Sequence, residues 1–248
     1  SYILFFTDKG KCYWVKVYDI PEGGRAAKGR AIVNLIGCEP DEKVSAFISV
    51  KEFNEDHYVV MATEKGMVKK TKLSAYSNPR KKGIYAVEIR DGDKLIEARV
   101  STGDNDILLG TRNGKSIRFS EEQIRASGRK TMGVKGITLS SEDDRLVGML
   151  LIKREGTVLV ATEKGFGKRT EISQYRAQKR GGKGVLTMKT TDKVGKMVTI
   201  KEVVDKDDLM IITNQGVLIR LPVAQIRSIG RATPVSYTHL TLPTTLSV

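Results

Sequence analysis

The stretch Val158-Leu-Val-Ala-Thr-Glu-Lys-Gly165 decides the fold, because related copies of it recur along the chain. Similar runs end at Gly10, Gly66, Gly114 and Gly216, so subtraction of residue numbers places successive turn glycines 56, 48, 51 and 51 residues apart. A threonine stands three residues before each of these glycines. Five matches at nearly constant spacing predict a structural repeat of about 50 residues.

Each copy has the features of a β-hairpin. An apolar, β-prone run precedes the glycine, a basic strand follows it, and the glycine supplies the positive φ that a tight turn needs. Asn113-Gly114 suits a type I′ turn, whereas the Lys-Gly copies suit a type I turn with a G1 bulge. Helix signals are weak, and residues 121–126 and 223–226 are expected to form one turn each.

Further strands are expected outside the hairpins, where short apolar runs are rich in β-branched residues. These runs are residues 31–36, 44–50, 86–89, 94–100, 136–139, 146–152, 185–188 and 198–204. Each repeat therefore contains about four strands, which is the size of a propeller blade. Because a four-stranded blade cannot bury both faces alone, blades that pack around an axis are the expected arrangement.

The sequence thus predicts one all-β, propeller-like domain over residues 1–234, with repeat units at approximately 1–46, 47–96, 97–146, 147–200 and 201–234. Residues 235–248 match no blade strand and contain no Lys, Arg, Asp or Glu. We interpret this last segment as a non-native tail.

Composition limits the possible functions. The 248 residues include 43 Lys or Arg and 29 Asp or Glu, which gives a net charge of +14. Only two cysteines and two histidines are present, and no HExxH, CxxC, GxSxG or GxxxxGK[ST] motif occurs. We therefore expect no enzyme activity, metal site or cofactor in this chain, and a reducing cytoplasmic setting. The charge predicts a polyanionic partner.

The basic residues follow the repeat and form two sets. The first set lies three or four positions after the turn glycine and comprises Lys69, Lys70, Arg118, Lys168, Arg169 and Arg220. The second set surrounds a later glycine and comprises Arg25, Lys28, Arg30, Arg80, Lys81, Lys82, Arg129, Lys130, Lys135, Lys179, Arg180, Lys183, Arg227 and Arg231. Equivalent positions in a circular array lie at equivalent places on its rim. We expect a basic belt that contacts DNA phosphates and bends a duplex, although any single member can be ordinary solvated surface.

The loop Gln178-Lys179-Arg180-Gly181-Gly182-Lys183-Gly184 closely resembles the GyrA box, the Q-R/K-R-G-G-K-G heptapeptide in the C-terminal domain of the DNA gyrase A subunit. Residues 24–35, 61–71, 132–137 and 161–170 resemble parts of other blades of that family. The resemblance covers about residues 1–233. It indicates that the chain starts inside a blade, so the loop at 178–184 belongs to a later blade than the principal box and acts either as that box or as a secondary loop.

This resemblance implies a β-pinwheel, a six-bladed disc with its own strand order, of which about five blades are recognisable. It implies that double-stranded DNA wraps around the basic rim, so that the parent gyrase introduces negative supercoils by ATP-dependent strand passage. The catalytic tyrosine, ATP and magnesium belong elsewhere in that complex, whose other members are the gyrase B subunit and a second A subunit. The implied location is the bacterial cytoplasm, with the nucleoid and without a membrane partner.

Three other interpretations stay open. The first is the homologous domain of the topoisomerase IV A subunit, which bends DNA, although the intact heptapeptide favours gyrase. The second is a protein-interaction propeller whose charge serves solubility. The third is an enzyme that uses the acidic clusters Glu142-Asp143-Asp144 and Asp205 with Asp207-Asp208, which we expect instead to be exposed turns.

Overall fold

The regular secondary structure consists almost entirely of β-strands, joined by loops and short helices. The computed structural model describes residues 1–24, 29, 31–212, 216 and 218–233, and the predicted tail lies outside this range. The chain divides into two compact units: unit 1 contains residues 1–105 and 121–136, and unit 2 contains residues 106–120 and 137 onward. The predicted all-β architecture is confirmed.

Unit 1 contains eight strands among the described residues: β1 (Tyr2–Thr7), β2 (Lys11–Lys16), β3 (Val44–Val50), β4 (Tyr58–Thr63), β5 (Met67–Lys72), β6 (Ile84–Tyr85), β7 (Leu95–Ser101) and β10 (Val134–Lys135). Its short helices are η1 (Val17–Asp19), α1 (Ile32–Ile36), η2 (Leu73–Tyr76) and η3 (Glu121–Gln123).

Unit 2 contains nine strands within the described range: β8 (Asp106–Thr111), β9 (Lys115–Ser120), β11 (Leu146–Ile152), β12 (Thr157–Thr162), β13 (Gly167–Glu171), β14 (Val185–Leu186), β15 (Met197–Val203), β16 (Asp208–Ile212) and β17 (Leu218–Pro222). Its 3-10 helices are η4 (Ile172–Gln174) and η5 (Val223–Gln225).

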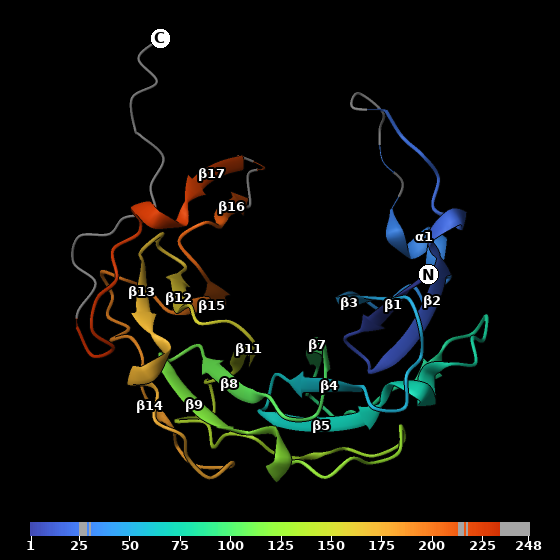
Figure 1. The fold of residues 1–248 in the computed structure, drawn as a ribbon, viewed down its shortest axis with the longest axis horizontal. Helices are drawn as coiled ribbons and strands as arrows, with labels where there is room; N and C mark the ends of the chain where they lie inside the picture. Colours follow the sequence, from blue (N-terminus) through green and yellow to red (C-terminus); the bar gives the residue numbers. More distant parts are fainter. Residues whose placement is uncertain (25–28, 30, 213–215, 217, 234–248) are drawn as a thin grey trace. The chain divides into compact units, whose positions relative to one another are not determined.

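Each four-stranded sheet combines three strands of one repeat with one short strand of the next. In unit 1 the strand orders are β3-β1-β2-β6 and β10-β5-β4-β7, and in unit 2 the complete sheet is β11-β8-β9-β14. Figure 1 shows the short strand β14 beside β9, although they belong to different repeats. Among the described residues the fourth sheet, β13-β12-β15, has three strands and the fifth, β16-β17, has two. Because each of these sheets contains strands of two repeats, the boundaries between the five repeats stay a prediction.

The recurring threonine and glycine close the hairpins. In the second repeat the Gly66 N–H donates to the Thr63 carbonyl at 3.0 Å, and the Thr63 hydroxyl oxygen accepts the Met67 N–H at 3.2 Å. The first, third and fourth hairpins make the same two hydrogen bonds. The threonine therefore satisfies a backbone donor that the turn would otherwise leave unpaired.

The turn glycine also joins one repeat to the next. The Gly10 carbonyl accepts the Ala86 N–H at 2.8 Å, and the Gly114 carbonyl accepts the Thr187 N–H at 2.8 Å. A Cβ on Gly10 would lie 2.4 Å from the Val87 carbonyl oxygen, at a φ of +78°. Glycine is thus required both by the positive φ and by the close approach of the following repeat.

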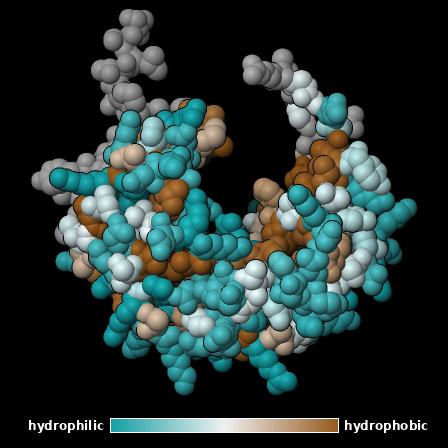
Figure 2. All heavy atoms as spheres, in the orientation of Figure 1, coloured by the Kyte–Doolittle hydropathy of each residue, from teal (hydrophilic) through white to brown (hydrophobic). Residues whose placement is uncertain are grey.

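Each unit has its own apolar core between sheets. In unit 1 Phe6 of β1, Met61 of β4 and Tyr76 of η2 belong to one buried cluster, and the rings of Phe6 and Tyr76 meet edge to face at 5.9 Å. In unit 2 Leu108 of β8 and Val160 of β12 belong to a similar cluster. Full burial of such a side chain contributes about 1.5–3 kcal/mol. In Figure 2 the visible surface is mostly hydrophilic, with hydrophobic residues in strips between hydrophilic ones.

Local structure differs from the sequence-based prediction at a few places. Asn113 has no positive φ, so its hairpin is not a type I′ turn and follows the same pattern as the others. The strand predicted at residues 31–36 is wrong, because α1 forms there and is capped by Gly37, whose N–H donates to the Val33 carbonyl at 3.1 Å. Ile36 packs against β1 and β2, which places an apolar helical face on the sheet.

The predicted strands at 86–89 and 136–139 are also wrong, and the one at 185–188 is too long. The short edge strands β6, β10 and β14 end at Tyr85, Lys135 and Leu186. The two residues that follow β6 both donate their N–H groups to the Gly10 carbonyl, and the two that follow β14 both donate to the Gly114 carbonyl. The ladder of hydrogen bonds between strands therefore stops there. The single 3-10 turns expected within 121–126 and 223–226 are confirmed as η3 and η5.

We predict that Gly10→Ala lowers the free energy of unfolding of unit 1 by about 2 kcal/mol or more. Positive φ alone costs a non-glycine residue roughly 1–2 kcal/mol, and the new methyl would collide with the Val87 carbonyl. Urea unfolding followed by the fluorescence of Trp14, the only tryptophan, measures the change. The matched control is Gly128→Ala, where no atom lies within 4 Å of the new Cβ. Equal stability of the two variants would contradict the role given to Gly10.

Candidate nucleic-acid interface

Three basic loops connect a 3-10 helix (η2, η3 or η4) to the edge strand that pairs with the preceding repeat (β6, β10 or β14), and one more basic loop follows η5. We call residues 77–83, 125–133, 176–184 and 227–233 the second, third, fourth and fifth basic loops. The second and third lie in unit 1, and the fourth and fifth in unit 2. The residues predicted for the first loop, Arg25, Lys28 and Arg30, lie outside the described range.

Each of the last three loops is fixed at its start by the preceding repeat. Isolated parallel bridges join Lys70 to Ala126, Arg118 to Ala177 and Arg169 to Ser228. The Gln178 N–H donates to the Arg118 carbonyl at 2.8 Å, and equivalent bonds hold the other two loops. The third and fourth loops are also held at their far ends, where an edge strand pairs with the same neighbouring repeat.

The loops expose many of the predicted basic side chains. Exposed members are Arg80, Lys81 and Lys82 in the second loop, Lys130 in the third, and Lys179 and Lys183 in the fourth, together with Lys135 on β10 and Arg220 on β17. Arg129, Arg180 and Arg231 are half-buried, as are Gln178, Gly181, Gly182 and Gly184. The guanidinium of Arg220 is paired with Asp208 on the adjacent strand.

The fourth basic loop has a defined backbone geometry. Thr138 donates its hydroxyl to the Gly181 carbonyl at 2.6 Å and its N–H to the Gly182 carbonyl at 2.9 Å. Because the carbonyl and N–H of a trans peptide point in opposite directions, the amides of Gly182 and Lys183 point away from Thr138. The Gly182 amide faces the Lys179 carbonyl across the turn at 180–181, whereas the Lys183 amide, on the same loop as the exposed Lys179 and Lys183 side chains, is suited to a phosphate oxygen.

Glycine is needed at two places in this loop. Gly181 and Gly184 have φ values of +80° and +70°. A Cβ on Gly184 would lie 2.5 Å from the Ser116 carbonyl oxygen of β9. These two positions therefore set the path of the loop over the preceding repeat.

The residues four positions after the turn glycine join repeats. Lys70 and Arg169 are 6% and 7% exposed, so the expectation that they lie on the surface is wrong. Arg169 donates its Nε–H to the Ile226 carbonyl at 2.7 Å, and Arg118 donates to the Tyr175 carbonyl at 3.3 Å. Trp14 occupies this position in the first repeat and donates its indole N–H to the Tyr76 carbonyl in the same way, at 2.9 Å.

All three of these cations are also paired with carboxylates, Arg169 with Asp205. Arg118 contacts Asp106 at 2.6 Å, and the Lys70 ammonium lies 3.5 Å from the fully buried carboxylate of Glu121. Such partners compensate part of the cost of removing the charge from water. These side chains therefore stabilise the contact between repeats.

Lys69 and Lys168, three positions after the turn glycine, are 1% and 0% exposed, so their predicted surface position is wrong too. Lys69 Nζ donates to the carbonyls of Ala86, at 2.7 Å, and Arg129. Lys168 Nζ donates to the carbonyls of Gly230, Arg231 and Thr233 at 3.1, 2.5 and 3.2 Å.

Burial, followed by the charge of a nearby arginine, changes the titration of both lysines. It lowers the pKa of Lys69 to about 7, with Arg129 as the second cause and an opposing effect of Glu88. It lowers the pKa of Lys168 to about 8, with Arg231 as the second cause. Both ammonium groups lie under basic loops, since their hydrogen-bond acceptors include carbonyls of the third and fifth loops.

Arg231 is hydrogen-bonded to residues of unit 2, to which it belongs. Its guanidinium donates to the Leu186 carbonyl, and its backbone N–H donates to Gln174 Oε1 at 2.8 Å. Its side chain is thus used to hold the fifth loop against the fourth repeat.

Arg125 and Arg176 are absent from the belt predicted above, although the repeat contains the signal for them. Together with Arg227 they lie eleven positions after the turn glycines of three successive repeats. All three are exposed, and each directly follows a buried residue at the start of a basic loop. The common distance from the turn glycine identifies them as equivalent surface cations.

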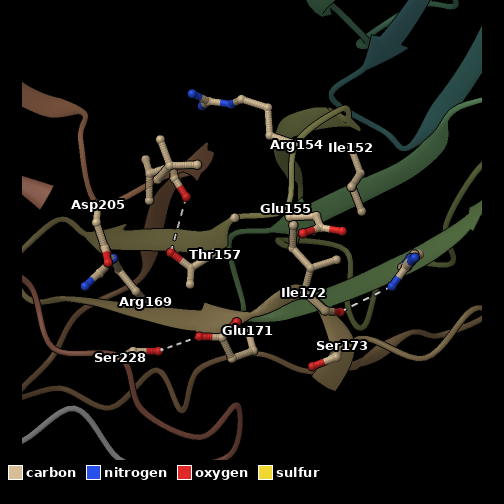
Figure 3. A pocket seen from close by; sticks show the side chains of 14 residues that line it. Ile152, Arg154, Glu155, Thr157, Arg169, Glu171, Ile172, Ser173, Asp205 and Ser228 are labelled. Atoms are coloured by element: carbon tan, nitrogen blue, oxygen red, sulfur yellow. Dashed lines mark hydrogen bonds and ion pairs between the residues drawn. The ribbon is translucent and has the colours of Figure 1, made fainter. Parts of the chain in front are cut away.

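A cavity of about 620 Å³ lies in unit 2 between the fourth sheet and its neighbours. Its charged lining residues are Arg118, Arg154, Arg169, Glu155, Glu171 and Asp205. Figure 3 shows that several of these groups are already partnered: Arg169 pairs with Asp205, and Ser228 donates to Glu171. Equal numbers of basic and acidic groups give the cavity no net charge with which to attract an anion.

Carboxylates of the acidic clusters accept hydrogen bonds from backbone N–H groups and so stabilise turns. Asp144 is buried, so its predicted exposure is wrong, and its carboxylate accepts the Asn113 and Arg145 N–H groups at 2.9 and 3.0 Å. Asp207 accepts the Val204 N–H and pairs with Arg154. In the part of the chain that the structure describes, no three His, Cys, Asp or Glu residues gather as a metal would require. None of the described helices is long and apolar enough to span a membrane.

Comparison with known sequences identifies the repeats. The family model described as "DNA gyrase C-terminal domain, beta-propeller" matches residues 1–51, 57–102, 105–153, 156–203 and 207–235. The chain is 50% identical over 229 residues to the DNA gyrase A subunit of Clostridium acetobutylicum, and 42% identical over 231 residues to that of Salmonella typhimurium. These matches cover 92% and 93% of the chain but 28% and 26% of the relatives. The chain thus spans about a quarter of their length.

Solved structures show the same fold. The C-terminal domain of a DNA topoisomerase IV matches with a TM-score of 0.85 at 26% identity, covering 94% of the chain and 72% of that domain. A DNA gyrase A C-terminal domain matches with a TM-score of 0.84 at 22% identity, covering 98% of the chain and 79% of that domain. With five matched segments and relatives of high identity, the chain belongs to the family of DNA gyrase C-terminal β-propeller domains.

Proposed function

We propose that the chain binds double-stranded DNA through its basic loops and wraps it, as part of a DNA gyrase A subunit. The observation that carries this proposal is the geometry of the fourth basic loop. Thr138 holds the carbonyls of Gly181 and Gly182, so that the Lys183 amide points away from Thr138 on a loop that carries the exposed Lys179 and Lys183. Amides and ammonium groups recognise phosphate oxygens and carry little base information.

The recurrence of the loops supports wrapping. The second to fifth loops follow one another along the chain: the last three begin at equivalent parallel bridges, and the second to fourth end at equivalent edge strands. A duplex that contacts several loops in succession is held at several phosphates, and its bending energy is offset by those contacts. Binding of this kind releases counterions and weakens steeply with salt.

The relatives suggest the complex and the cell compartment in which the chain would work. As part of a gyrase A subunit, the chain would work with a second A subunit and a gyrase B subunit, and the wrapped DNA would be used for ATP-dependent negative supercoiling. ATP and magnesium would act outside this chain, which itself would need no cofactor and catalyse no reaction. Its substrate would place it with the bacterial nucleoid in the cytoplasm.

The second candidate is DNA bending within a topoisomerase IV. The likeness to a topoisomerase IV C-terminal domain in fold favours it, whereas the 41–50% identity to gyrase A subunits favours gyrase. A protein-interaction propeller is a weaker candidate, because the family match and the relatives are those of DNA gyrase; salt-dependent DNA affinity would exclude it.

We predict that replacing Lys179, Arg180 and Lys183 together by Gln weakens binding to unrelated duplexes by the same factor. If the triple variant loses two or three phosphate contacts, the slope of log K against log salt becomes shallower by roughly 0.9 for each one. Fluorescence anisotropy at several salt concentrations measures both quantities.

The matched control replaces three exposed lysines outside the loops, Lys193, Lys201 and Lys206, by Gln. It removes the same net charge and should change the slope little. If both triple variants bind DNA equally well, the fourth loop does not have the role proposed here.

We also predict that Arg125→Gln, Arg176→Gln and Arg227→Gln each weaken DNA binding regardless of sequence. Each exposed guanidinium is expected to contact one phosphate, so each variant should reduce the salt slope by roughly 0.9. The same anisotropy titrations on two duplexes of different sequence test this. A change confined to one duplex, or no change in slope, would argue against a phosphate contact.

A further inference from the structure

Two buried lysines in the same position of different repeats donate their hydrogen bonds to backbone carbonyl oxygens. Lys69 in the second repeat and Lys168 in the fourth each donate to the following repeat's basic loop. The charged groups that affect Lys69 are Arg129 and Glu88, and the one that affects Lys168 is Arg231. An ammonium held mainly by neutral dipoles is sensitive to any further charge placed nearby.

Each lysine ammonium donates a hydrogen bond to a peptide carbonyl of its loop, and the residue that follows this carbonyl is exposed. Lys69 donates to the Arg129 carbonyl, so the N–H of the same peptide, which belongs to Lys130, points away from the ammonium. Lys168 donates to the Arg231 carbonyl, so the N–H of Ala232 points away from it. Lys130 and Ala232 are both exposed, and both lie sixteen positions after their turn glycine.

We propose that these two peptides form phosphate sites in which the N–H of Lys130 or Ala232 donates to a DNA phosphate oxygen while the buried lysine beneath binds a proton taken up from the solvent. The inference rests on the proposed DNA binding and deepens it. The peptide dipole lies between ammonium and phosphate, so each of the two charges strengthens the interaction of the peptide with the other.

The direction of the linkage follows from the titration of the free protein. With pKa values of about 7 and 8, the two lysines are partly neutral at neutral to mildly alkaline pH. A bound phosphate favours the charged ammonium and raises its pKa. Binding therefore takes up protons, and affinity falls as pH rises through the pKa of the free lysines.

The fourth basic loop provides an internal contrast. The position equivalent to Lys69 and Lys168 is Ile117, which is fully buried and lies under Gly182. The carbonyls of this loop are held by Thr138, which does not titrate. Phosphate binding there is expected to be independent of pH in the same range.

The first test measures affinity for one duplex from pH 6.5 to 9 at constant ionic strength. If a phosphate raises each lysine pKa by about one unit, affinity falls about five- to sevenfold per lysine over this range. Lys69→Met and Lys168→Met should each remove their share of the pH dependence. Lys130→Gln is the matched control: it removes an exposed charge in the same loop, so it lowers affinity at every pH but keeps the slope.

The second test needs no variant and therefore holds even if a buried methionine destabilises a loop. Titration calorimetry of the unchanged chain with the same duplex, in buffers of different ionisation enthalpy at pH 7.5, gives the number of protons taken up. Given the two pKa values, a rise of about one unit in each corresponds to an uptake of about 0.7 proton per chain, and complete protonation to about one.

Proton uptake together with a falling affinity supports the proposal. Tight binding with a flat pH profile and no proton uptake would overturn it and leave DNA binding intact. A chain that does not bind the duplex at any pH would instead overturn the proposed function itself.

Discussion

The structure depends on one backbone contact, the hydrogen bond from a following repeat to the carbonyl of a hairpin glycine. At Gly10 and Gly114 the glycine faces a passing segment so closely that no Cβ fits. The next repeat thereby supplies the short strand that completes the sheet. Within the described residues no four-stranded sheet is formed by one repeat alone, and stability is shared between neighbours, as in other repeat proteins.

The pairing of a short strand with the preceding repeat also fixes the position of the basic loops on their sheets. Each of the last three begins at a parallel bridge to the preceding repeat, and the third and fourth end at an edge strand paired with the same repeat. A short loop held at both ends has little conformational freedom to lose when it binds a ligand. The loops are thus presented by the β-scaffold in a fixed conformation, which favours repeated, equivalent phosphate contacts.

The Lys and Arg side chains have two different functions, one for the buried and one for the exposed members. Lys70 and Arg169 are buried and bind carbonyls or carboxylates of the next repeat, where an unpaired charge would be strongly destabilising. Lys130, Lys179 and Lys183 are exposed on the loops. The net charge of +14 therefore overstates the charge available to DNA, and the buried members act by shaping the surface on which the exposed members lie.

Local features of the fold could be predicted from the sequence. The Thr-x-x-Gly pattern identifies the hairpins because its hydrogen bonds lie within five residues. The burial of Lys69 and Lys168 could not be predicted, because each has a carbonyl partner about 60 residues away in another repeat. Arg125 and Arg176 could have been found, since their distance from the turn glycine is the same as that of Arg227.

The most direct measurement of the central claim is a change in DNA topology. The chain is mixed with nicked plasmid, the nick is sealed with ligase, the protein is removed, and the topoisomers are separated on a gel. Wrapping around successive basic loops predicts a shift in linking number that increases with protein concentration and has one sign. Binding in a gel-shift assay without any change in linking number would contradict wrapping by this chain.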